Sequence, residues 1–137
     1  MANEIKLTFG DSTEGILQSK NFETKVSYTG QGMAPYELFL GGFASCLHAT
    51  FMGVMRKRKL EYSKVEYNVV AHKREEVPTL INKLVTEITI YGANPEKQNQ
   101  ISKSMAQAEK YCSISETINR LGAEMIFNIQ YTLCVVF

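Results

Sequence analysis

The run "GGFASCLHATFMGVM" (41–55) constrains the fold more than any other part of the chain, because it contains no charged residue. It lies inside a longer segment, 36–58, whose pattern predicts a single helix that is apolar on nearly every side and therefore buried centrally. A membrane span is the rival interpretation, since about twenty apolar residues suffice and the basic cluster 56–59 follows. Glu37, His48 and the amphipathic strands elsewhere favour a core helix, so we expect no membrane partner.

Around this helix, the chain alternates between strand-like and helix-like periodicity. Gly122 ends the last predicted helix, and "SISE" (113–116) is typical of a capping box in which Ser113 caps that helix. The order βββ-α-ββ-αα-β predicts an α+β fold in one domain, residues 1–137. The predicted strands are Ile5–Phe9, Ile16–Leu17, Phe22–Tyr28, Val65–His72, Leu84–Ile90 and Met125–Val135, and the later helices lie between Asn94 and Cys112 and between Ser113 and Gly122.

Charge and cysteine content exclude several classes of protein. The net charge of +1 argues against a nucleic-acid partner. The three cysteines, Cys46, Cys112 and Cys134, are widely spaced and form no CxxC motif. This pattern argues against a disulfide scaffold or a zinc site, and the N-terminus alternates like a strand rather than a signal peptide. We therefore expect a cytoplasmic protein that binds no metal and no cofactor.

Cys46 lies on a helical stripe of small residues with Gly42, Ala49 and Gly53, a stripe that permits close approach of a second copy of the helix. By periodicity alone, a lone buried cysteine is more often an inert small hydrophobe than a reactive group. Cys46 and His48 point about 200° apart on a helix, so they cannot share a metal ion. We expect neither His48 nor His72 to be catalytic.

Cys112 changes this balance because it directly precedes a second helix. A thiol beside a helix N-terminus has a lowered pKa, so the sequence predicts that Cys112 favours the thiolate. Cys46 and Cys112 are therefore candidates for a peroxidatic and resolving pair. Cys134 falls on the polar side of the last predicted strand and is expected to be a bystander.

Two stretches, "GQGMAPYELFLGGFASCLHATF" and "AEKYCSISETI", resemble the OsmC/Ohr family of osmotically inducible and organic-hydroperoxide-resistance proteins. The family pattern has a Gly-x-x-Pro loop with a cysteine eleven residues after the proline, and the spacing from Pro35 to Cys46 matches it. Its second cysteine usually stands in Cys-Pro-x-Ser, and here Ser113 replaces that proline.

The resemblance implies an intertwined homodimer with the long helices at its centre. It also implies a thiol-dependent peroxidase in which Cys46 attacks an organic hydroperoxide and Cys112 captures the resulting sulfenic acid as a disulfide. An external dithiol reductant then restores the thiols.

The chain departs from the family pattern at two charged positions. Peroxidase members carry Glu immediately after the loop proline, where this chain has Tyr36; Glu37, the candidate third catalytic residue, comes one position later, which places it roughly opposite Cys46 on the helix. The family also holds the thiolate with an N-terminal arginine, and this chain has none before Arg56. Without a nearby cation, the pKa of a buried Cys46 thiol is expected to rise.

Two other functions remain open from the sequence. One is a redox sensor or another thiol protein that reacts with a different electrophile. The other is a binding module that keeps the dimer and its apolar interfacial pocket without catalysis.

Overall fold

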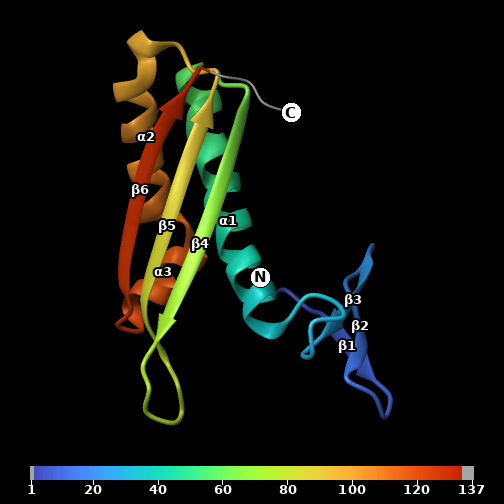
Figure 1. Ribbon diagram of the computed structural model, residues 1–137. Coiled ribbons are helices and arrows are strands. Elements are labelled where there is room, and N and C mark those ends of the chain that lie inside the picture. Colours follow the sequence, from blue (N-terminus) through green and yellow to red (C-terminus); the bar gives the residue numbers. More distant parts are fainter. Residues whose placement is uncertain (1, 134–137) are drawn as a thin grey trace. The chain divides into compact units, whose positions relative to one another are not determined.

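The computed structural model describes residues 2–133, which divide into two compact units, one within Met1–Gly41 and one within Gly42–Phe137 (Figure 1). The predicted order of elements is confirmed, with one short 3-10 turn added before the second helix. Cys134 and the end of the last predicted strand lie outside the described residues. The elements are β1 (Lys6–Phe9), β2 (Glu14–Gln18), β3 (Glu23–Ser27), α1 (Pro35–Arg58), β4 (Lys64–Lys73), β5 (Ile81–Tyr91), η1 (Pro95–Lys97), α2 (Gln98–Tyr111), α3 (Ser113–Arg120) and β6 (Glu124–Thr132).

The first unit is an antiparallel meander in the order β1-β2-β3. Gly15 lies opposite Phe9, and a Cβ at position 15 would come within 2.9 Å of the Phe9 ring, so glycine leaves room for that ring. The unit buries Val26, whereas Ile5 and Phe22 are exposed. A three-stranded sheet needs a covered hydrophobic face for stability, so this meander requires a further surface.

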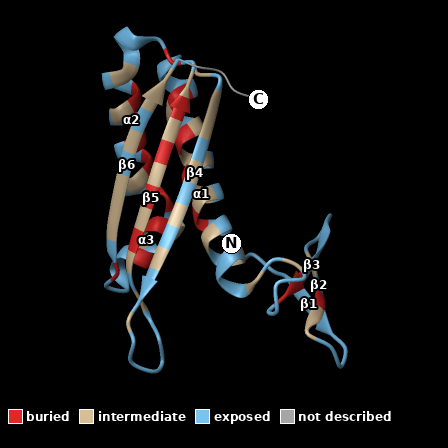
Figure 2. Cartoon of the chain, viewed as in Figure 1, coloured by how far each residue is buried: buried red, intermediate tan, exposed pale blue. Residues whose placement is uncertain are grey.

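In the second unit, α2, α3 and the part of α1 from Gly42 onward lie on one face of a sheet of order β4-β5-β6 (Figure 1). β4 and β5 pair antiparallel, while β5 and β6 pair parallel and are therefore joined by a crossover that contains η1, α2 and α3. Alternate residues of β5 are wholly buried, and Figure 2 shows this band along the central strand. These buried residues are Leu84, Thr86, Ile88 and Ile90.

Within this unit, α1 buries one face, formed by Phe43, Leu47, Phe51 and Met55. The Phe43 ring lies 6.3 Å from the ring of Phe127 on β6. By length and composition, α1 could cross a membrane, but this face packs as a core helix does. The opposite, small-residue stripe is different: its members Gly42, Ala49 and Gly53 are exposed in the single chain.

Candidate functional site: a paired-thiol centre

Cys112 forms the joint between two helices of the crossover. Its backbone N–H donates to the Ala108 carbonyl at 2.8 Å and so closes the last turn of α2. Its backbone is then extended (φ −68°, ψ 119°), and its Sγ accepts a hydrogen bond from the Ser115 N–H at 3.5 Å. Cys112 is therefore both the C-cap of α2 and the N-cap of α3, and its side chain is fully buried.

The prediction that Ser113 caps this helix is wrong by one residue. Ser113 is the first residue of α3, because the extended backbone that a cap requires belongs to Cys112. The capping box also fails to form, since the Glu116 carboxylate accepts a hydrogen bond from the Arg120 guanidinium at 2.8 Å. A thiol thus occupies the position that the pattern assigned to a hydroxyl.

Cys46 lies in the middle of α1, half-buried, and faces the start of α3. Its Sγ is 3.9 Å from the Ser113 hydroxyl oxygen. The groups that lower the pKa of Cys46 include the Cys112 thiol and the backbone N–H groups of Ile114 and Ser113. The fold therefore brings together the two cysteines that the sequence nominated, and both are free thiols.

The pKa values of the two thiols are the reverse of the sequence expectations. Burial raises the pKa of Cys46, but the hydrogen bonds from Ile114, Cys112 and Ser113 outweigh it, and the net pKa is lowered. Burial is also the largest influence on Cys112; with the adjacent Cys46 sulfur, it raises the pKa of Cys112 despite the Ser115 N–H. The donors at the start of α3 thus favour a thiolate at Cys46, while burial and the adjacent Cys46 sulfur favour a protonated thiol at Cys112.

Glu37, the third nominated residue, has a structural contact at the start of α1. Its Oε1 accepts a hydrogen bond from the Ala34 backbone N–H at 2.8 Å. Glu37 is the third residue of α1, and its carboxylate bonds back to the cap residue, Ala34. The bond satisfies one of the backbone donors that the first turn of a helix leaves unpaired. A catalytic role for Glu37 stays a prediction.

The two histidines lie apart from the groups that act on the thiols in the described part of the chain. His48 Nδ1 lies 2.9 Å from the Tyr67 hydroxyl of β4, and burial lowers the pKa of His48. His72 is exposed on β4. Between residues 2 and 133, no three His, Cys, Asp or Glu side chains gather into a group that could hold a metal ion.

Glu109 is a half-buried carboxyl on α2, one turn before Cys112, and burial raises its pKa to about 7. The folded state therefore holds a proton that the unfolded chain releases from about pH 4.5 upward, so stability is lost as the pH rises toward 7. We expect Glu109→Gln to melt with the parent near pH 4 and to be more stable by about 1 kcal/mol at pH 8, after a discount for the exposed half of the side chain. Thermal melts across this range check it, and a constant difference between the two proteins would contradict it.

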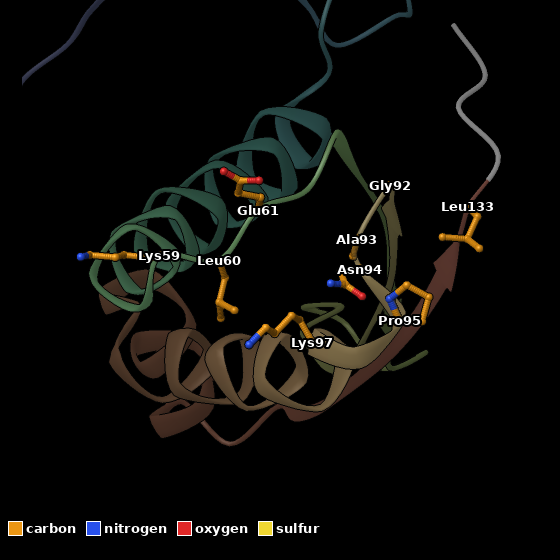
Figure 3. Close-up of a pocket in the computed structure, with 9 residues that line it drawn as sticks. All are labelled: Lys59, Leu60, Glu61, Gly92, Ala93, Asn94, Pro95, Lys97 and Leu133. Carbon is orange, nitrogen blue, oxygen red and sulfur yellow. The ribbon is translucent and has the colours of Figure 1, made fainter.

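A separate pocket of about 430 Å³ lies between two segments, the residues that follow α1 and the residues at the start of η1 (Figure 3). Lys59, Asn94 and Lys97 are among its lining residues, and neither cysteine is. Cys46 precedes Arg58, the last residue of α1, by about 18 Å along the helix axis. This pocket is therefore distinct from the thiol centre.

Sequence reasoning missed the groups that act on Cys46. Ser113 was assigned to the helix cap, and the backbone N–H of Ile114 has no side-chain signature. One signal in the sequence pointed to Ser113: it stands where the OsmC/Ohr pattern has proline. Proline has neither a hydroxyl nor an N–H, so serine adds two hydrogen-bond donors at this position.

Comparisons with known proteins agree with this architecture. The family profile described as OsmC-like protein matches residues 28–125. A hypothetical protein from Aquifex aeolicus is similar with a TM-score of 0.83 at 17% identity, over 98% of this chain and 99% of that one. An OsmC-like protein from Mycoplasma pneumoniae gives 0.82 at 17% identity, with the same coverage.

The organic hydroperoxide resistance protein OhrB of Bacillus subtilis is a further structural neighbour. Its TM-score is 0.66 at 16% identity, over 95% of this chain and 98% of that one. A search of curated proteins found no significant match. At these identities the solved structures show the fold alone, whereas the family profile covers most of the chain. The chain belongs to the OsmC-like protein family.

Proposed function

We propose that the protein is a thiol-dependent peroxidase that reduces organic hydroperoxides, with Cys46 as the attacking thiol and Cys112 as the resolving thiol. The observation that carries this proposal is the position of Cys46 Sγ, 3.9 Å from the Ser113 hydroxyl oxygen and so at the start of α3, where Cys112 is the cap residue. The opposite directions of the two pKa shifts, each of which includes the other thiol among its causes, support it. A thiolate is the nucleophile in this chemistry, and a protonated thiol beside it can serve as the second reactant.

The reaction has two steps on the protein. The Cys46 thiolate attacks the terminal oxygen of the hydroperoxide, so that an S–O bond forms, the O–O bond breaks, and the alkoxide leaves as an alcohol after taking a proton. The Cys112 sulfur then attacks the sulfenic sulfur, a disulfide forms, and water leaves. A dithiol reductant reduces this disulfide and becomes a disulfide itself, which closes the cycle.

A homodimer in the cytoplasm is part of the same proposal. It is supported by the exposed stripe of Gly42, Ala49 and Gly53, because small residues let two helices approach closely. The weakly covered meander, which leaves Ile5 and Phe22 exposed, is a second surface that needs a partner.

Turnover measurements test the proposed activity. With a dithiol reductant, we expect the protein to consume cumene hydroperoxide at least about tenfold faster, as kcat/KM, than hydrogen peroxide, a difference of about 1.4 kcal/mol that apolar contact with the substrate can supply. Cys46→Ser is the matched inactive control. Equal rates for the parent and Cys46→Ser would refute the peroxidase and favour a binding module.

A further inference from the structure

We propose that Ser113 holds the Cys46 sulfur in its reactive state, through its hydroxyl and its backbone N–H, in a chain that has no arginine before Arg56. The inference rests on the proposed function, because it assumes that Cys46 is the attacking thiol. It assigns Ser113 as a positioning residue that acts through Cys46.

The contacts at the start of α3 support this role. The Ser113 hydroxyl oxygen is 3.9 Å from Cys46 Sγ, and its N–H belongs to the first turn, where the helix leaves backbone donors without partners. The Ile114 N–H, in the same first turn, also lowers the pKa of Cys46. Among the described residues, the groups that act on the Cys46 pKa include no Lys or Arg. The stabilisation therefore comes from hydrogen-bond donors rather than from a full positive charge.

The backbone at this joint makes a clean experiment possible. Cys112 is already extended, as a residue before proline must be, and position 113 is the first helical position, where proline is well tolerated. Ser113→Pro should therefore fold, while it removes both the hydroxyl and the N–H. Ser113→Ala removes the hydroxyl alone, and Ser113→Thr keeps both donors.

The measurement is the rate of Cys46 alkylation by iodoacetamide as a function of pH, followed by peptide mapping in the full chain with Cys112 and Cys134 present. We expect the midpoint to rise by about half a pH unit in Ser113→Ala and by about one unit in Ser113→Pro. These shifts lower the thiolate fraction below the midpoint about threefold and about tenfold. Ser113→Thr should keep the parent profile.

Thr117→Ala is the matched control, because it removes another exposed hydroxyl from α3, one that donates to the Ser113 carbonyl at 2.7 Å rather than to a sulfur. Its alkylation profile should coincide with that of the parent. Ser113→Ala and Ser113→Pro profiles equal to the parent's would overturn the inference, and so would a Ser113→Thr profile as shifted as that of Ser113→Ala. Failure of the proposed peroxidase function would give a different result from failure of the Ser113 inference. Cys46 would then be alkylated with the expected pH dependence but would remain reduced in excess hydroperoxide.

Discussion

One equivalent of an organic hydroperoxide should remove two free thiols per chain, and peptide mapping should find a Cys46–Cys112 disulfide. The expectation follows from the position of Cys46 against the start of α3, since a sulfenic acid formed on Cys46 would arise next to the residue that caps this helix, Cys112. Such a disulfide requires the Cα atoms of Cys46 and Cys112 to come within about 7 Å of each other.

The three cysteine variants should separate the roles of the thiols. Cys46→Ser should lose peroxide consumption altogether, while Cys112→Ser should stop at a sulfenic acid that a dimedone probe traps. Cys134→Ser, predicted from the sequence to be a bystander, is the matched control and should behave like the parent. Loss of two thiols in the Cys112→Ser variant would contradict the assignment of the resolving residue.

The pairing of Cys46 with Cys112 was accessible from the sequence, because both cysteines carry positional information. Cys46 lies eleven residues after Pro35 in a recognisable loop and helix, and Cys112 precedes a helix with a polar first turn. The periodicity of the strands also predicted the order of elements that the structure has. These features depend on residue spacing and periodicity within short segments, which can be seen in a single sequence.

The directions of the two pKa shifts were not accessible from the sequence, and the reason is a shift of one residue. Ser113 was assigned as the cap because a hydroxyl is the usual acceptor there, whereas the buried Cys112 thiol takes that position. Since Ser113 then becomes the first helical residue, its N–H and that of Ile114 are free to act on Cys46. The sequence does not show that the Cys112 side chain accepts the capping hydrogen bond of α3. It also does not show that Cys46 lies next to the unpaired N–H groups of the first turn of α3.

If the proposed homodimer forms, with a mass of about 31 kDa, twice the 15.5 kDa chain, replacement of Ala49 by Arg should convert it into monomers at micromolar concentration. Ala49 is exposed on α1 in the single chain, among the small residues Gly42 and Gly53. In a twofold dimer each copy of the stripe faces the other, so the substitution brings two like charges into an interface that has room only for small side chains. A penalty of about 4 kcal/mol corresponds to a dissociation constant roughly a thousandfold higher.

Ala106→Arg provides the matched control, because it places the same side chain at an exposed position of α2. Light scattering should give the parent mass for Ala106→Arg and half that mass, or an aggregated product, for Ala49→Arg. Circular dichroism distinguishes a folded monomer from a chain that unfolds when its meander loses cover. A parent protein that is a stable monomer, or an Ala49→Arg variant that stays dimeric, would show that the stripe on α1 is not the dimer contact. The exposed face beside Cys46 would then be open to solvent and substrate in the single chain.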